Sequence, residues 1–164
     1  MTREQEAGYM TVLAGAICRE IGARDFYRRI SGEIRNAEGK DRFKRLSGDE
    51  EGHRKKLESW YEKLFGKRFA ADPAMLKEAE IGDVKLSKQA GAMAALDIAI
   101  KAEAAAEEFY AKQAESVSAP ALKELFAKLS AEEHGHYEML VAERNSLAGG
   151  FYWFDMDSTT FLED

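Results

Sequence analysis

Apolar residues recur every three or four positions along four long stretches of the chain, which is the period of an amphipathic α-helix. These stretches cover roughly residues 4–35, 38–66, 88–117 and 119–147. Strong helix formers dominate them, and the chain has prolines only at positions 73 and 120. No sustained alternation of Val, Ile or Thr with polar residues indicates a strand. The pattern therefore predicts an all-α protein.

The connections between the stretches differ in length, and this difference predicts the topology. Short connections within each half make its two helices antiparallel neighbours, whereas residues 66–87 are enough to carry the chain to the other end of a bundle. Ser118 is the expected N-cap of the fourth helix, with Pro120 in its first turn. We expect one domain, a ferritin-like antiparallel four-helix bundle over residues 1–147, with one long crossover between its second and third helices. A short aromatic tail, not a separate domain, follows at residues 148–164.

The second half of the chain repeats the first at an offset of 83 residues, without a gap. The matching positions are Ala16-Ile17 and Ala99-Ile100, Glu20 and Glu103, Ala23 and Ala106, Phe26-Tyr27 and Phe109-Tyr110, Phe43 and Phe126, Leu46-Ser47 and Leu129-Ser130, Glu50 and Glu133, Gly52-His53 and Gly135-His136, and Leu57 and Leu140. Chance would give a few scattered matches, not every Glu, His and aromatic residue of a helical stripe. Each half therefore predicts the same helix pair.

Each predicted helix carries an inner stripe whose middle positions are polar. The stripes of the first half are Ala16, Glu20, Ala23 and Tyr27 in one helix and Phe43, Leu46, Glu50, His53 and Leu57 in the next, and the second half repeats both. The spacings of three and four residues place each set on one helix face. A core stripe should be apolar, because a buried unpaired carboxylate costs several kcal/mol. The stripes thus predict a buried polar site in the middle of the bundle.

Metal ions explain this buried polar set best. The stripes offer no Lys or Arg at these positions, and two divalent cations would neutralise four carboxylates. Glu and His three residues apart converge on one ion, and Glu20 and Glu103 can cap or bridge. Oxygen and imidazole ligands without sulfur suit iron, with manganese or zinc as possible substitutes. The predicted ligands of this two-metal site are Glu20, Glu50, His53, Glu103, Glu133 and His136.

Composition and charge exclude several other classes of protein. The net charge of −6 is spread along the chain, so nothing indicates a nucleic-acid partner. No run of about 18 apolar residues could span a membrane, and residues 1–8 lack the apolar centre of a secretory signal. The single cysteine, Cys18, allows neither an intrachain disulfide nor a CxxC metal site, and we expect it to be a buried structural thiol. A cytoplasmic location is the default expectation.

With these motifs in place, the chain resembles the rubrerythrin family of the ferritin-like superfamily. The likeness is carried by Ala16-Ile-x-x-Glu20-x-x-Ala23-x-x-Phe26-Tyr27, by Glu50-x-x-His53 and by their copies, and it covers roughly residues 10–145. The resemblance implies a non-haem di-iron enzyme that reduces hydrogen peroxide or dioxygen and protects against oxidative stress. It also implies a homodimer or larger homo-oligomer.

Two departures from the family pattern keep other functions open. Full-length rubrerythrins add a rubredoxin-like domain with four cysteines, so here electrons are expected from an external donor protein. The family's second glutamate on the third helix falls on Ala106, and the neighbouring Glu107 is rotated by about 100°. The resulting six-ligand set is similar to that of bacterioferritin, although no methionine is placed as a haem ligand. A ferroxidase or iron-handling protein is the first alternative, and a structural bundle with redox-silent metal is the second.

Tyr27, Tyr110, His134 and the aromatic tail lie outside the predicted ligand set. Tyr27 and Tyr110 could hydrogen-bond a ligand carboxylate or take part in electron transfer, or they could simply pack in the core. His134 lies beside a ligand but off the inner stripe, which predicts a surface position. The aromatic tail, from Phe151 to Phe161, is expected to fold back on the bundle or pack against a partner subunit.

Overall fold

The computed structural model describes residues 1–82 and 89–149, and these contain five α-helices and no strand. The all-α fold class is therefore confirmed. The helices are α1 (Arg3–Glu33), α2 (Ala37–Phe65), α3 (Pro73–Ala79), α4 (Gln89–Ser116) and α5 (Pro120–Ala148). Nearly all of the predicted aromatic tail lies outside the described residues, so its packing stays a prediction. No described helix has the length and apolar character that crossing a membrane requires.

The four long helices begin and end within two residues of their predicted bounds. Local capping residues mark several of these helix ends. Before α1, Thr2 and Gln5 form a capping box: the Thr2 hydroxyl accepts from the Gln5 amide, and the Gln5 side chain accepts from the Thr2 amide. Before α2, the Asn36 side chain accepts a hydrogen bond from the amide of Gly39. After α2, Gly66 takes a φ of 65°, a left-handed conformation that glycine adopts without steric cost.

One predicted cap is wrong. The N-cap of α5 is Ala119, not Ser118, and the Ala119 side chain makes no capping hydrogen bond. Pro120 does occupy the first turn, as predicted. Proline has no backbone N–H, so this helix end has one fewer unpaired donor for a capping side chain to accept from.

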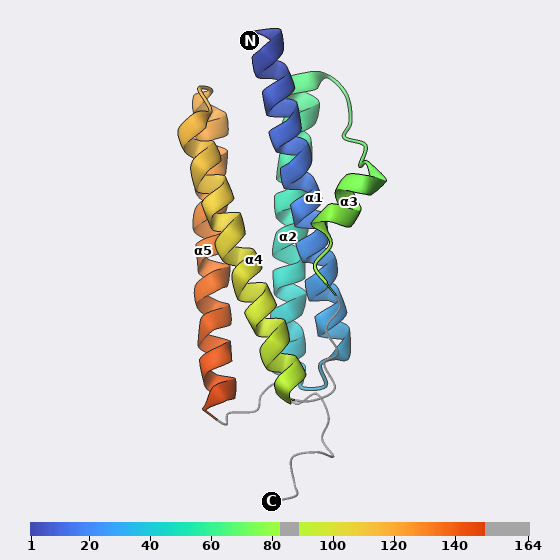
Figure 1. The fold of residues 1–164 in the computed structure, drawn as a ribbon, viewed down its shortest axis with the longest axis vertical. Coiled ribbons are helices and arrows are strands. Elements are labelled where there is room, and N and C mark those ends of the chain that lie inside the picture. The colour runs from blue at the N-terminus through green and yellow to red at the C-terminus, as the bar shows by residue number, and fades with distance from the viewer. Residues whose placement is uncertain (83–88, 150–164) are drawn as a thin grey trace, which may run out of the picture. The chain divides into compact units, whose positions relative to one another are not determined.

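The long segment after α2 contains α3, a two-turn helix that the sequence analysis treated only as a break. Asp72 caps it by accepting a hydrogen bond from the amide of Ala74 at 2.9 Å, and Pro73 takes the first turn. The helix lies against α1 (Figure 1), and a Cβ at Gly22 would clash with the carbonyl oxygen of Ala79. Glycine at position 22 therefore allows the close approach of α3 to α1.

The described chain divides into two compact units. The first contains α3 and nearly all of α1 and α2, and the second contains α4, α5 and the connection at residues 33–39. Within each unit the two long helices lie side by side and run in opposite directions (Figure 1). Whether residues 1–147 form a single domain stays a prediction.

Contacts between the long helices repeat from one unit to the other. In the first unit the rings of Tyr27 and Phe43 lie 5.9 Å apart, and in the second those of Tyr110 and Phe126 lie 6.0 Å apart. All four side chains are buried. Each pair links the two long helices of its unit at an offset of 83 residues from the other pair. The sequence repeat therefore corresponds to a repeat of tertiary contacts.

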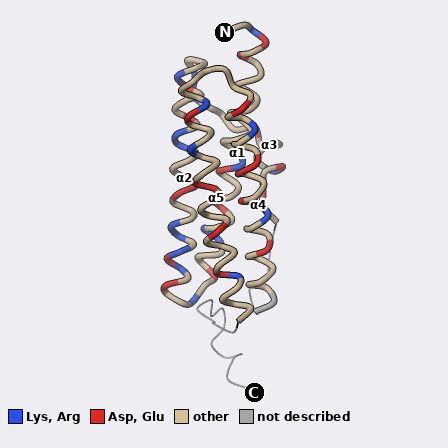
Figure 2. Tube along the Cα trace, turned by 90° about the vertical axis from the view of Figure 1, so that its left-hand side faces the viewer, with Lys and Arg blue, Asp and Glu red and all other residues tan. Residues whose placement is uncertain are grey.

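Charged residues occupy the outer positions of these helices. Figure 2 shows basic and acidic residues interspersed along α2. The apolar side chains of the long helices fill the interior, including Leu13, Ile17 and Leu57, which are fully buried. Against this background the buried carboxylates of the long helices stand out as exceptions.

Candidate metal centre

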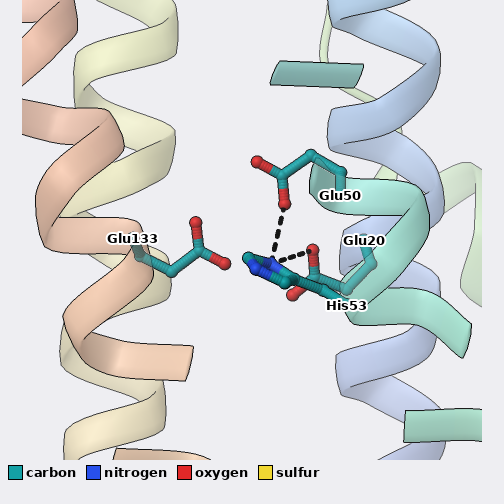
Figure 3. Close-up of side chains that lie close together, drawn as sticks. All are labelled: Glu20, Glu50, His53 and Glu133. Atoms are coloured by element: carbon teal, nitrogen blue, oxygen red, sulfur yellow. Dashed lines mark ion pairs between the residues drawn. The ribbon is translucent and has the colours of Figure 1, made fainter. Parts of the chain in front are cut away.

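The first unit brings three of the predicted ligands together. Glu20 comes from α1, whereas Glu50 and His53 lie one turn apart on α2 (Figure 3). Nδ1 of His53 lies 3.2 Å from a carboxylate oxygen of Glu50 and 3.5 Å from one of Glu20. One ligand atom from each residue lies within 4.8 Å of the others, and all three side chains are at most 3% exposed. We call this set the first triad.

The second unit contains the same arrangement at the repeated positions. Glu103 comes from α4, and Glu133 and His136 come from α5. Nδ1 of His136 lies 3.1 Å from a carboxylate oxygen of Glu133 and 3.7 Å from one of Glu103. Both carboxylates are buried, while 12% of the His136 side chain is exposed, against 2% for His53. We call this set the second triad.

Helix geometry explains why each triad converges. Glu and His three residues apart on one helix lie on the same face, one turn from each other. The antiparallel partner helix presents its glutamate opposite them, and the contacts of Tyr27 with Phe43 and of Tyr110 with Phe126 join the same two helices in each unit. All six residues of the predicted ligand set are thus gathered into triads, three in each unit.

The donor set of each triad fits a transition-metal ion. Two carboxylates and one imidazole supply oxygen and nitrogen ligands without sulfur, the mixture that suits iron or manganese and also accepts zinc. Burying two carboxylates beside each other is costly, and a bound cation offsets that cost. Without a metal ion, a protonated imidazole between the two carboxylates would do so only partly. A metal-bound imidazole must be neutral, so metal binding would displace that proton.

Each triad is flanked by a charged cluster, and the two clusters differ. In the first unit, Arg24 bonds the carboxylate of Glu51 at 2.8 Å, and Arg54 bonds both Glu51 and Glu58. Hydrogen bonds from Arg54 lower the pKa of Glu51 to about 2, with a smaller contribution from Arg24, although burial opposes the shift.

In the second unit the positions equivalent to Arg24 and Glu51 hold Glu107 and His134. Nδ1 of His134 lies 3.1 Å from a carboxylate oxygen of Glu107, and its Nε2 lies 3.3 Å from one of Glu138. The hydrogen bond and the charge of Glu107 raise the pKa of His134 above its usual value. About half of the His134 side chain is exposed, which confirms the predicted surface position.

Other predicted residues fall as follows. Tyr27 and Tyr110 are buried in the aromatic contacts described above, and a role for them in the chemistry stays a prediction. Cys18 is buried, as expected of a structural thiol, and burial raises its pKa, with a smaller contribution from Asp72. The sequence analysis missed Glu143, which is only 4% exposed on α5. Its spacing of three residues from Leu140 and four from Leu147 would have placed it on the inner stripe.

The comparison with known families decides which proteins share this architecture. The rubrerythrin family model matches residues 11–144. The chain belongs to the rubrerythrin family. Membership means that the fold is that of a ferritin-like helical bundle and that the buried Glu and His triads fit the family's di-iron binding.

A solved structure with a similar fold supports this family assignment. It is a hypothetical protein from Pyrococcus furiosus, 31% identical in sequence, with a TM-score of 0.76 over 87% of this chain and 91% of that one. No curated protein matches the chain significantly. The comparisons therefore identify the family and the fold, whereas the reaction has to be inferred from the residues.

Proposed function

We propose that this rubrerythrin-family protein is a non-haem di-iron oxidoreductase that reduces hydrogen peroxide or dioxygen with electrons from an external donor protein. The observation that carries the proposal is the duplicated triad of two buried carboxylates and one imidazole in a member of this family. Each triad would hold one iron ion, and the two ions would work as a pair. The proposed ligands are Glu20, Glu50, His53, Glu103, Glu133 and His136.

The chemistry divides between the metal and the protein. When bound, the iron pair would supply the two electrons that cleavage of a peroxide bond consumes. The four carboxylates hold the negative charge that balances two divalent ions, and the imidazoles provide one neutral donor in each triad. Burial of the four carboxylates places them in a medium of low dielectric constant, which strengthens their electrostatic interactions. Tyr27 and Tyr110 would act from the surrounding core, through hydrogen bonding or electron transfer.

A ferroxidase is the second candidate, and one observation favours it. The position at which rubrerythrins carry an additional glutamate is Ala106 here, and Glu107 points its carboxylate to His134 instead. Six symmetric ligands without a seventh are the set that bacterioferritin-like iron handling uses. In that case Fe(II) would be the substrate, and manganese or zinc would compete for the same ligands.

Parallel oxidation experiments distinguish the two candidates. Metal-free protein is loaded anaerobically with Fe(II), and its absorbance is followed after mixing with hydrogen peroxide or with air. Much faster oxidation by peroxide, giving an oxo-bridged ferric spectrum that a reductant bleaches, would support the proposed oxidoreductase with peroxide as its oxidant. Fast oxidation by air with continued uptake of added iron would indicate a ferroxidase.

A matched pair of variants ties the signal to the triads. Glu50→Gln removes a carboxylate from the first triad, whereas Glu51→Gln changes the adjacent residue, which pairs with Arg54. We expect only Glu50→Gln to abolish the ferric spectrum. If iron binds but neither oxidant changes its oxidation state, the result would support the remaining alternative, a structural bundle with redox-silent metal. The expected homodimer or larger oligomer can be measured on the same sample by light scattering.

A further inference from the structure

Two serines connect the long helices beside the triads. Ser47 on α2 donates its hydroxyl hydrogen bond to the backbone carbonyl of Arg24 on α1, at 3.0 Å. Ser130 on α5 donates to the carbonyl of Glu107 on α4, also at 3.0 Å. The second bond repeats the first at an offset of 83 residues in both donor and acceptor. The same interhelix bond is therefore present in each unit.

This behaviour is unusual for a serine inside a helix. Such a hydroxyl normally bonds a carbonyl three or four residues earlier in its own helix. Ser31 does this here, donating to the carbonyl of Arg28 at 2.8 Å. A carbonyl in a helix interior already accepts one amide but keeps a second lone pair, which Ser47 uses on Arg24. The bond exists only while the two helices stay close and in this register.

The bonds lie at a defined place relative to the ligands. Ser47 precedes Glu50 by three residues, and Arg24 follows Glu20 by four, so the bond is one turn from the first triad. On the other side of Glu50, His53 contacts Glu20. The stretch of α2 from Ser47 to His53, about 9 Å of helix, thus contacts α1 at both ends, through a hydrogen bond at Ser47 and through the approach of His53 to Glu20.

The second unit has the same construction. Ser130 precedes Glu133 by three residues, and its acceptor Glu107 follows Glu103 by four. His136 contacts Glu103 on the far side, as His53 contacts Glu20. The side chain at the acceptor position changes from arginine to glutamate, but the acceptor is the backbone carbonyl, so the bond does not depend on that side chain.

We propose that Ser47 and Ser130 are positioning residues that fix the helix register on which each triad depends. A slip of one residue would turn the ligand-bearing face by about 100° and separate the imidazole from the opposite glutamate. The serines are not metal ligands. They determine the backbone positions from which the Glu and His side chains extend. This inference rests on the proposed metal-binding function and adds to it residues outside the ligand set.

The test measures metal affinity rather than turnover. Metal-free protein with all 164 residues is titrated with Co(II) under anaerobic conditions, and the visible absorption bands report each bound ion and its ligand geometry. We expect Ser47→Ala to weaken binding at one of the sites about tenfold, the equivalent of one lost hydrogen bond, and Ser130→Ala to do the same at the other. Ser31→Ala is the matched control, because it removes a buried hydroxyl that bonds within its own helix. It should leave both affinities unchanged.

A second pair of variants isolates the hydroxyl from side-chain size. Thr and Val have nearly the same shape, but only Thr keeps the donor. Ser47→Thr should bind Co(II) within about twofold of the wild type, and Ser47→Val should show the same tenfold loss as the alanine variant. Circular dichroism verifies that each variant keeps its helices, and the Thr and Val pair stays informative if the alanine variant fails to fold.

Different outcomes overturn different claims. Equal Co(II) affinities of the Thr and Val variants, or an equal loss in Ser31→Ala, would overturn the positioning role while the metal site stands. Failure of the wild-type protein to bind Co(II) at all would overturn the proposed function, and the positioning role with it.

Discussion

The two helix pairs of this protein share their interior but differ in what flanks it. Both carry a Glu, Glu and His triad with His to carboxylate distances between 3.1 and 3.7 Å, and both have a serine that bonds the opposite helix at 3.0 Å. The flanking pair, however, is Arg24 with Glu51 in one unit and Glu107 with His134 in the other. The positive and negative partners have changed helices.

This difference separates what the site requires from what it tolerates. The repeated positions are those whose atoms meet at the triad or fix the helix register. At the flanking positions an acidic residue pairs with a basic one in both units, but the two residues have exchanged helices. Each position in one unit has an equivalent position in the other unit. The effect of a substitution can therefore be compared between the two.

The largest expected effect comes from the triads themselves. Metal ion at about 100 times its dissociation constant should stabilise the folded protein by about 2.7 kcal/mol for each independent site. Glu50→Gln and Glu133→Gln should each lose the stabilisation of one site. Without metal the same variants should be as stable as the wild type or more so, because a buried charge has been removed.

Thermal unfolding with and without Co(II) measures both effects, the lost stabilisation by metal and the unchanged or higher stability without it. Glu51→Gln and Glu132→Gln, which change the residues next to the ligands, serve as controls that keep the metal-dependent shift. A shift of wild-type size in Glu50→Gln would show that this carboxylate holds no metal.

A smaller effect is expected where α3 lies on α1. Gly22→Ala places a methyl group against the carbonyl oxygen of Ala79, so we expect a loss of about 1–3 kcal/mol in the free energy of unfolding. The equivalent residue of the second unit is Ala105, which shows that the repeat itself does not demand glycine.

The control for this substitution is Gly15→Ala, since nothing lies within 4 Å of a Cβ at that position. It should be neutral or stabilising by up to about 1 kcal/mol, because alanine is the better helix former. Denaturant unfolding measures both variants. Equal effects of the two substitutions would rule out the close contact between α3 and α1.

The flanking pair of the first unit should contribute about 1 kcal/mol, since Glu51 is partly buried and bonded to two arginines. The pKa of Glu51 is lowered to about 2, so its contribution is present above the unfolded pKa of about 4.3. It is lost as the pH falls toward 2. Glu51→Gln should therefore be less stable than the wild type at pH 7, and the difference should disappear near pH 2. Urea titrations across this range would refute the pairing if the difference stays constant.

The smallest effect is expected at the exposed pair of the second unit, and its pH dependence has the opposite sign. Glu107 raises the pKa of His134, so the stabilisation is complete below the unfolded pKa of about 6.5 and is lost as the pH rises through the folded value. His134→Gln should match the wild type above pH 8 and be slightly less stable at pH 5. A titration of His134 by NMR measures the direction of the shift, and a lowered pKa would contradict the pairing.

Much of the fold could be predicted because its signals are local. Helical periodicity placed the long helices within two residues of their bounds, and the structure adds Asn36 and Gly66 as the residues that mark the two ends of α2. The helix α3 was missed, although an Asp72-Pro73 cap was present in the sequence, because seven residues carry too little periodicity. Ser118 was predicted to be the N-cap of α5, but the N-cap is Ala119. Errors of one residue are common at helix ends.

The triads were predictable because a duplicated Glu-x-x-His on an otherwise apolar stripe is an anomaly that the sequence displays directly. The role of Ser47 and Ser130 was not, because their acceptors are backbone carbonyls of another helix, and a carbonyl has no sequence signature. The exchange of Arg24 and Glu51 for Glu107 and His134 could be read in the sequence, but its meaning depended on seeing that each pair is in contact.

The most direct measurement is the number of metal ions that each chain binds, determined by anaerobic titration with Fe(II) or Co(II) of the wild type, of Glu50→Gln and of Glu133→Gln. If each triad holds one ion, the wild type binds two per chain, and each variant loses one while its remaining ion keeps an imidazole ligand. A wild type that binds no ion, or variants that still bind two with unchanged affinity, would contradict the assignment of the metal centre to these triads.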